Sequence, residues 1–489
     1  MVPSKWLSTR RWLVFLLGFS LFYLYSGGGP NQGTRFNLDR ALLEQGSVTT
    51  DSYYTNSEDR AFHRGHYYCD KAPGASFAAI PVLALTRVFL RFTGVDPEGA
   101  QGLLLQMHVA TWTASTLPTW LMCLLVFAWV KRWGGTRMAA VYAALALGLA
   151  SPFWAYGTLF WGNALAAFCL VFAARGVVDA IYKPNAKRVV TPALLAGLAT
   201  GLAVVTEFPT APMAMALFVL LLAKLRPWCR HWQRLVAYAA GALAAACVLG
   251  VYNFVAFGSP FHLGYSSVEG FEGMKQGLFG VGWPRMEAIS GVLWGQRGLL
   301  LTAPILVLGI LGHVVSIVRG RNRLMSQLCL AFSFYPLLLN VSYVYWDGGW
   351  SYGPRHMSSA LPFMALGLAP LYDALRPYAR SVAVAALGGA VFMTMMAVAI
   401  HGMTPYEPSN SLLDLYWPSL VMGRFARHAG WTDSGGPATN LGLALGLSRA
   451  NSLIPLWVGM GVGLSGLIRS LWPASASREG QQALPRLLP

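Results

Sequence analysis

Residues 235–257 read LVAYAAGALAAACVLGVYNFVAF, and this stretch decides the fold class. The run contains no charged residue, and a helix of roughly 20 apolar residues is what crosses the hydrocarbon of a bilayer. Similar runs recur along the whole chain of 489 residues, which is 55% hydrophobic and only 11% charged. A water-soluble core of this size does not bury so much apolar surface. The sequence therefore predicts an all-α, polytopic membrane protein.

Working outward from this run, we expect about twelve membrane spans. They lie at residues 12–25, 107–130, 138–157, 160–182, 191–206, 210–226, 235–257, 298–318, 326–345, 357–375, 382–401 and 452–472. The first run is short and follows basic residues, so a secretory signal peptide is the alternative to a retained helix. Residues 26–30 lack the Ala-x-Ala pattern of a cleavage site, which favours the retained helix.

Basic residues gather in alternate loops between these spans. The loops contain Lys131, Arg132 and Arg137; Lys183, Lys187 and Arg188; Lys224, Arg226, Arg230 and Arg234; Arg319, Arg321 and Arg323; Arg376 and Arg380; and Arg469, Arg478 and Arg486. Short loops rich in Lys and Arg face the cytoplasm. Of the nineteen acidic residues, only Asp179, Asp373 and Glu479 fall on this side. We therefore expect both termini in the cytoplasm, and a bacterial inner (plasma) membrane as the location.

The segment Ala75–Phe92 is the ambiguous one, because it is apolar enough to span but carries Arg87 and Arg91. If it crossed, every later basic loop would move to the outer side. The positive-inside pattern therefore predicts a helix that lies in the outer membrane surface, with its arginines reaching the head groups.

The expected organisation has three parts. Residues 1–402 form a transmembrane catalytic region with a long first outer loop at 26–106. Residues 403–451 form an extracytoplasmic loop, and residues 452–489 form the last transmembrane helix with a cytoplasmic tail. The outer loops are long or rich in Trp, Tyr, Gly, Asp and Arg, so function is expected on the extracytoplasmic side.

The first outer loop concentrates charged residues close to the predicted surface helix. Asp51, Asp59, His66, Asp70 and Lys71 fall within about twenty residues, and Ala-Pro-Gly follows them. A lysine at this level neutralises a lipid phosphate, and a nearby carboxylate removes a proton from a hydroxyl acceptor. A solvated charged loop is the alternative interpretation.

A late outer loop, YVYWDGGWSYGPRHM at 343–357, carries a second set of polar residues. Asp347, Tyr352, Arg355 and His356 are interleaved with glycines and tryptophans. Glycines allow tight turns close to a ligand, and a planar guanidinium binds phosphate through two nitrogens. An anchor at the membrane interface is the alternative role for the arginine.

Two further charged residues stand at the mouths of predicted helices. Arg297, in GQRGLLL, is a candidate phosphate ligand. Glu207, in TEFP, is placed near hydrocarbon, where a carboxylate is costly, so it is a candidate acid, base or arginine partner.

Other classes of site find little support. The basic residues behind the net charge of +17 gather in short loops whose charge sets the orientation of the protein in the membrane. No nucleic-acid partner is therefore expected. The histidines and cysteines show no zinc spacing, and GVGLSG at 461–466 lies inside an apolar run with no strand before it. No cofactor is expected with certainty, but the acidic outer residues leave a divalent metal possible.

The arrangement resembles the GT-C superfamily of integral membrane glycosyltransferases, in the bacterial branch of protein O-mannosyltransferase-like and lipid A aminoarabinose transferase-like enzymes. The resemblance rests on Asp70–Lys71–Ala72–Pro73 before a surface helix, on the multi-span body, and on GGWSYGPRH at 348–356. It implies a polyprenyl-phosphate-linked sugar donor, an outward-facing site, an acidic base in the first outer loop, and Lys71 and Arg355 as phosphate ligands.

One departure from that family pattern concerns the base. Relatives place an Asp-Glu pair shortly after the first helix, where this chain has Asn31–Gln32. Since amides cannot accept the proton, the role passes to Asp39, Asp51, Asp59 or Asp70, or the chain has lost catalysis. Asp51 and Asp70 are the preferred bases.

The resulting hypothesis is an inverting glycosyltransferase that moves a sugar from a polyprenyl-phosphate donor to a glycan, lipid or protein acceptor. A multi-span transporter or flippase for lipid-linked sugars is the alternative. Transporters place ionisable groups near the midplane of the membrane, whereas here they gather at the outer surface, which favours the enzyme.

Overall fold

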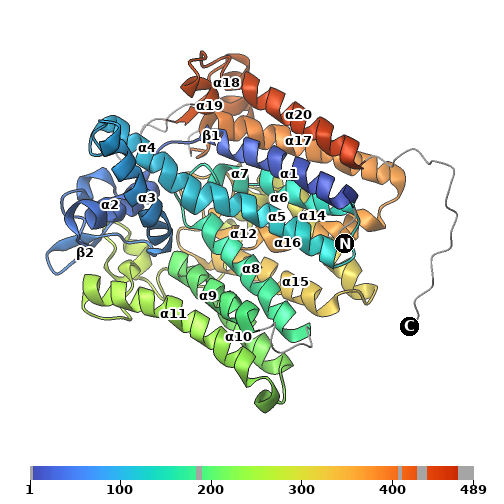
Figure 1. The fold of residues 1–489 in the computed structure, drawn as a ribbon, viewed down its shortest axis with the longest axis horizontal. Coiled ribbons are helices and arrows are strands. Elements are labelled where there is room, and N and C mark those ends of the chain that lie inside the picture. Colours follow the sequence, from blue (N-terminus) through green and yellow to red (C-terminus); the bar gives the residue numbers. More distant parts are fainter. Residues whose placement is uncertain (1–3, 183–189, 406–409, 427–437, 472–489) are drawn as a thin grey trace.

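The computed structural model describes residues 4–182, 190–405, 410–426 and 438–471 (Figure 1). It is built almost entirely of helices, and each predicted span coincides with one. These helices are α1 (Ser4–Phe22), α4–α5 (Ala100–Thr111 and Leu117–Arg132), α6 (Arg137–Leu149), α8 (Asn163–Tyr182), α9 (Val190–Thr206), α10 (Ala211–Lys224), α11 (Trp232–Phe257), α14 (Pro304–Val318), α15 (Arg323–Ser342), α16 (Leu361–Ala374), α17 (Pro377–His401) and α20 (Ile454–Leu471).

Seven described helices are long and apolar enough to cross a bilayer, or eight if one bent pair counts as a single span. Four other apolar helices, α6, α9, α10 and α16, are shorter. This is an integral membrane protein with the predicted all-α, polytopic fold. The predicted span at 298–318 is bent, because the chain turns by 90° where Ala303 precedes Pro304, and a residue before proline avoids the helical conformation.

Shorter elements connect the long helices. They are α2 (Pro30–Arg40), η1 (Ala41–Gln45), η2 (Tyr54–Asn56), α3 (Gly74–Phe92), η3 (Trp112–Thr116), α7 (Phe153–Tyr156), η5 (Phe208–Thr210), η6 (Trp228–Arg230), η7 (Gly264–Ser267), η8 (Glu272–Lys275), α12 (Met286–Trp294), α13 (Leu299–Thr302), η9 (Arg355–Met357), η10 (Ser411–Tyr416), α18 (Trp417–Val421) and α19 (Leu441–Ala444). Two short antiparallel pairs join β1 (Leu24–Tyr25) to β4 (Thr439–Asn440), and β2 (Ala61–His63) to β3 (His66–Tyr68). The first pair and the packing of α20 along α1 attach the C-terminal part of the chain to its beginning (Figure 1).

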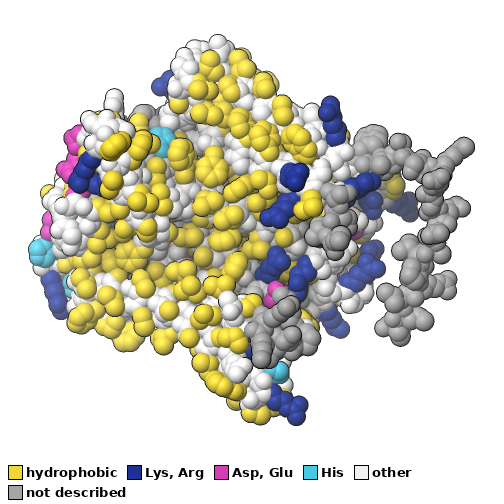
Figure 2. Space-filling model, viewed as in Figure 1, with side chains coloured by type: hydrophobic (Ala, Val, Ile, Leu, Met, Phe, Trp, Pro, Cys, Tyr) yellow, Lys and Arg dark blue, Asp and Glu magenta, His cyan; other side chains and the backbone are white. Residues whose placement is uncertain are grey.

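Lys and Arg side chains gather toward the end of the molecule that holds the N terminus, while Asp and Glu gather at the opposite end (Figure 2). We call these the basic end and the acidic end. At the basic end, Arg132 pairs with Asp179 at 2.7 Å, and Arg137 Nη1 donates to the carbonyl of Ser470 at 3.1 Å. The short basic loops that were predicted to lie on one side of the membrane therefore contact one another. The basic residues at 183–188, and Arg478, Glu479 and Arg486, lie outside the described residues.

The α3 helix packs against α2, α4 and η3 at the acidic end. Exposed apolar residues follow one face of it: Val82, Leu85, Val88, Phe89 and Phe92. This amphipathic character is typical of a surface helix. By length and composition α3 is also one of the seven helices that could cross a bilayer, so its placement in the membrane surface stays a prediction. The expectation for its first arginine was wrong, because Arg87 is buried and pairs with Glu44 at 2.9 Å and with Glu98 at 3.0 Å, instead of reaching head groups.

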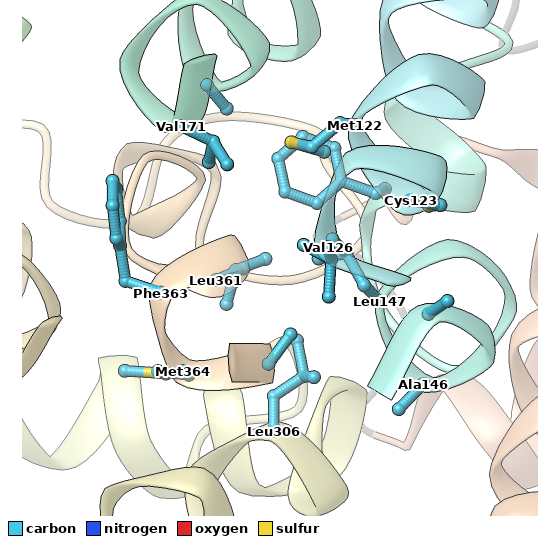
Figure 3. Close-up of a cluster of buried hydrophobic side chains, with 14 of the residues drawn as sticks. Met122, Cys123, Val126, Ala146, Leu147, Val171, Leu306, Leu361, Phe363 and Met364 are labelled. Atoms are coloured by element: carbon cyan, nitrogen blue, oxygen red, sulfur yellow. The ribbon is translucent and has the colours of Figure 1, made fainter. Parts of the chain in front are cut away.

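The core lies where α5, α6, α8, α14 and α16 meet (Figure 3). Met122, Val126, Leu147, Leu306 and Leu361 point toward one another there, from α5, α6, α14 and α16. Between α14 and α16, glycines bring the two backbones together, as small residues do in membrane helix pairs. This contact fixes α16, which directly follows the late outer loop.

Gly367→Ala tests that contact. A methyl group on Gly367 would lie on the carbonyl oxygen of Gly309 and 2.7 Å from His313 Cδ2. We expect a loss of about 1–3 kcal/mol in stability from this overpacking, seen as a lower melting temperature in detergent. Gly388→Ala is the matched control, because no atom lies within 4 Å of its added methyl group. Equal melting temperatures for the two variants would contradict this packing.

Candidate active site

The carboxylate–lysine cluster, which we define as Asp59, Asp70 and Lys71, occupies the end of the first outer loop. Lys71 Nζ lies 2.6 Å from Asp70 Oδ2 and 3.0 Å from Asp59 Oδ2. The Asp70 side chain is fully buried, and the other two are 11% and 13% exposed. Thr34 Oγ1 donates to the second oxygen of Asp70 at 3.3 Å. The structure therefore brings together two of the predicted acids and the predicted lysine.

Burial and charge act against each other in this cluster. Burial raises the pKa of Asp70, while the Lys71 ammonium opposes the rise. Burial by itself would lower the pKa of Lys71, but Asp59 and Asp70 outweigh that effect and raise it. Lys71 is therefore a cation at every physiological pH.

His66 lies elsewhere, on the exposed β2–β3 hairpin, and Asp51 contacts that hairpin from the turn before η2. Asp51 Oδ2 contacts His66 Nδ1 at 2.7 Å, and Asp51 Oδ1 accepts from the backbone N–H of Tyr67 at 2.7 Å. Their side chains are 42% and 55% exposed. The pair thus stabilises the hairpin, and neither residue contacts the carboxylate–lysine cluster.

Asp39 is placed in the interior of the loop, on α2. Its side chain is fully buried. Burial raises its pKa well above the ordinary value, although Ser76 and Arg35 act in the opposite direction. A side chain that is 0% exposed cannot be reached by an acceptor hydroxyl, so this geometry disfavours Asp39 as a base.

Arg35 connects the first outer loop to the helix bundle. It is 1% exposed. Its Nη1 donates to the carbonyl of Ala72 at 2.9 Å, its Nη2 lies 2.9 Å from Glu207 Oε1, and its Nε donates to Asn31 Oδ1 at 3.2 Å. The Asp70–Pro73 segment, α2 and the end of α9 are therefore held by one guanidinium. Glu207 therefore has an arginine partner, which is one of the alternative roles that the sequence suggested for it.

Arg355 is carried by the η9 turn of the late outer loop. Glycines with positive φ at Gly348 and Gly353 form the turns on either side of it. Its guanidinium lies 5.5 Å from the ring centroid of Trp161, and Asn163 Nδ2 donates to its carbonyl at 3.2 Å. Within the described part of the chain, no carboxylate comes within 4.0 Å of this guanidinium. The side chain of Arg355 is thus held by the Trp161 ring, and its positive charge can bind an anion.

Arg297, Asp347 and Tyr352 shape the loop that carries Arg355. Arg297 Nη1 donates to the carbonyl of Gly349, and its Nη2 lies 3.8 Å from Asp347 Oδ2. Asp347 also accepts from the Gly349 N–H at 3.2 Å. The Tyr352 side chain is buried, with its hydroxyl 3.5 Å from Thr394 Oγ1 on α17. These contacts define the turn geometry from which Arg355 projects.

Two tyrosines that the sequence did not single out connect the two halves of the site. Tyr343 stacks edge-on against His356 at 5.1 Å. Burial raises its pKa, while Lys71 and Arg355 both act to lower it. Tyr265, on η7, has its pKa raised by burial and then by Glu207, and Lys71 opposes this. Both phenols are therefore within electrostatic reach of the carboxylate–lysine cluster. No motif marked them, since their role depends on tertiary proximity.

His356 lies next to Arg355 in the late outer loop, and its imidazole is neutral. Burial lowers its pKa to about 3, and Arg355 and Lys71 add to the effect. His356 is therefore uncharged at neutral pH and does not compete for an anion as a cation.

Asn31 and Gln32, the amides that replace the expected acids, have structural contacts. Gln32 is fully buried, its Oε1 accepts from the Phe160 N–H at 2.7 Å, and its Nε2 donates to the carbonyl of Gly27. A carboxylate has no N–H to donate, so only an amide satisfies both partners. Gln32 thus ties the start of α2 to the chain before α8.

The acids of this region do not form a recognisable metal site. Within the described ranges, there is no group of three or more His, Cys, Asp or Glu side chains placed to hold a metal ion. The first-loop acids that suggested a possible divalent metal are instead in contact with Lys71, His66 or buried surroundings.

Comparison with solved structures gives similar architectures. ArnT from Cupriavidus metallidurans bound to undecaprenyl phosphate matches over 96% of this chain and 77% of its own, at 14% identity and a TM-score of 0.52. Its apo state matches over the same shares at 15% identity and a TM-score of 0.54. The Archaeoglobus fulgidus oligosaccharyltransferase, in complex with Zn and sulfate, matches over 81% of this chain and 54% of its own, at 14% identity and a TM-score of 0.51. No protein-family model and no curated protein sequence matches this chain.

These likenesses show the fold. The chain shares the fold of these proteins, as its resemblance to the GT-C superfamily implied.

Gln32→Glu tests the structural role of the amide. The new carboxylate would face the Gly27 carbonyl without a proton to donate, so we expect a loss of about 1–3 kcal/mol in stability, measured as a lower melting temperature in detergent. Gln45→Glu is the control, because Gln45 donates only to the exposed Ser52 hydroxyl. An unchanged melting temperature for Gln32→Glu would show that the amide contacts are dispensable.

Proposed function

We propose that this protein transfers a sugar from a polyprenyl-phosphate-linked donor to an acceptor hydroxyl at the acidic end of the molecule, on the extracytoplasmic face. The observation that carries the proposal is a chain of contacts that joins Lys71 to Arg355, two cations from segments far apart in sequence. Arg355 lies 5.5 Å from the Trp161 ring, and the next residue, Gly162, packs against Glu207. Glu207 pairs with Arg35, which also binds the carbonyl of Ala72, next to Lys71. The same fold in ArnT has been solved with undecaprenyl phosphate, which supports a lipid phosphate as the ligand.

Both cations have donors left for a phosphate. An ammonium has three N–H donors, and two of those on Lys71 are directed at Asp59 and Asp70. The third is available, and the two carboxylates hold the lysine in one orientation. Arg355 contributes a planar guanidinium stacked near Trp161, and this group binds phosphate oxygens in pairs. Arg297 serves mainly to hold the loop.

The proposed reaction is an inverting displacement. The acceptor oxygen forms a bond to the anomeric carbon of the sugar, and the bond from that carbon to the phosphate oxygen breaks. The electron pair leaves with polyprenyl phosphate, whose developing charge Lys71 and Arg355 stabilise. A carboxylate takes the proton of the acceptor hydroxyl. The carboxylates of Asp59 and Asp70 orient Lys71 in this scheme.

The membrane placement follows from the charge distribution. The basic end would face the cytoplasm with both termini, and the acidic end would face the extracytoplasmic side of a bacterial inner membrane. The apolar face of α3 would lie in the membrane surface where the lipid carrier approaches. The site residues discussed above lie within residues 1–402, the proposed catalytic region. The acceptor is a glycan, a lipid or a protein.

Arg355→Ala and Lys71→Ala test the phosphate ligands. Each removes a positive charge where the leaving group becomes negative, so we expect turnover to fall by about 10²–10³-fold. Release of undecaprenyl phosphate from lipid-linked sugar by purified protein in detergent, with cell-envelope extract as the acceptor source, is the measurement.

Arg91→Ala is the matched control, because Arg91 is an exposed arginine on α3. It should retain the turnover of the unaltered protein. Near-normal turnover in both Lys71→Ala and Arg355→Ala would contradict the mechanism.

A strain lacking the protein separates transfer from transport. A transferase deletion should accumulate a polyprenyl-phosphate sugar and lose its sugar from one surface glycan, lipid or protein. In detergent there are no compartments, so a flippase would release no undecaprenyl phosphate. Absence of both the accumulation and the detergent activity would overturn the proposed function.

A further inference from the structure

Glu207 differs from the other carboxylates of the site in its partner and in its exposure. Asp59 and Asp70 both contact the Lys71 ammonium, whereas Glu207 contacts Arg35 through Oε1. The Glu207 side chain is 19% exposed, compared with 11% for Asp59 and none for Asp70. Of these three acids, it is the one that a hydroxyl from outside reaches most easily.

The backbone and the neighbouring residues fix the position of the Glu207 carboxylate. It follows α9 and comes immediately before η5, with extended backbone. A methyl group on Gly162 would overlap Glu207 Oε1 and lie 2.8 Å from the Thr206 carbonyl, so only glycine leaves room for the carboxylate. After burial, Glu207 is the main cause of the raised pKa of Tyr265, on which Lys71 also acts. The Phe208 ring, next in sequence to Glu207, packs at 5.4 Å against the Tyr265 ring, and Gly264 packs against the backbone of Asp70. Glu207 and the carboxylate–lysine cluster therefore border the same tyrosine.

Arg35 holds Glu207 and Asn31 at one guanidinium. The Nη2 atom contacts Glu207 Oε1 at 2.9 Å, and the Nε atom donates to Asn31 Oδ1 at 3.2 Å. Residues 176 positions apart in the chain thus present oxygens to the same group. The oxygen from position 31 belongs to an amide, which accepts no proton at physiological pH, and the oxygen from position 207 belongs to a carboxylate.

We propose that Glu207 is the general base of the transfer reaction, which rests on the function proposed above. One carboxylate oxygen stays bound to Arg35, and the other takes the proton of the acceptor hydroxyl. The hydroxyl oxygen bonds to the anomeric carbon while the bond from that carbon to the phosphate oxygen breaks. The proton ends on Glu207, and the electron pair leaves with the polyprenyl phosphate.

This geometry predicts that a carboxylate at position 31, which also contacts the Arg35 guanidinium, can replace Glu207 as the base. Glu207→Gln keeps the shape and the hydrogen bond to Arg35 but removes the basic oxygen, so turnover should fall by about 100-fold or more. Adding Asn31→Asp places a carboxylate on the same guanidinium, and turnover should recover by about tenfold relative to Glu207→Gln alone. Glu98→Gln, which alters another arginine-paired carboxylate, is the control and should keep normal turnover.

The experiment measures turnover, melting temperature and binding of undecaprenyl phosphate for the purified variants. Loss of turnover in Glu207→Gln with unchanged binding and melting temperature, followed by recovery in the double variant, supports the base. Turnover within threefold of normal in Glu207→Gln overturns it, as does a fall in melting temperature with no recovery in the double variant. If the unaltered protein transfers no sugar, the proposed function itself fails, so the two failures are distinguishable.

Discussion

The buried guanidinium of Arg35 is the interaction on which the site depends. Three of its nitrogens contact oxygens from α2, from the segment before α3, and from the end of α9. A buried arginine is costly unless it is paired and fully hydrogen-bonded, so the first outer loop and the helix bundle are fixed relative to each other. That fixed relation places the carboxylate–lysine cluster opposite the late outer loop.

Charge is separated along the long helices, and this separation organises the chemistry. Basic side chains collect at one end and the acidic loops at the other (Figure 2). The cations at the acidic end differ in their partners. Arg87 is neutralised by Glu44 and Glu98, whereas Arg355 keeps its charge near Trp161 with no carboxylate beside it in the described structure. Under the proposed function, a lipid phosphate arriving at this end would meet Arg355 and Lys71 as its electrostatic partners.

Much of the fold could be predicted because span length, loop charge and the GT-C-like motifs are local properties of the sequence. Lys71 and Arg355 could be named as candidates for the same reason, since each sits in a recognisable motif. The choice among the acids could not be made locally. Asp51 and Asp59 look alike in sequence, yet one stabilises an exposed hairpin and the other contacts Lys71. The pairing of Arg35 with Glu207 spans 172 positions, and no spacing rule connects them.

The central claim is that Lys71 and Arg355 form one binding site for a lipid phosphate at the acidic end. A cryo-electron microscopy structure of the protein with undecaprenyl phosphate in a lipid nanodisc tests this most directly. The account predicts density for the phosphate within hydrogen-bonding distance of Lys71 Nζ and the Arg355 guanidinium, roughly 3 Å, with the lipid chain running along the membrane. Phosphate density at the basic end, or away from both residues, would contradict it.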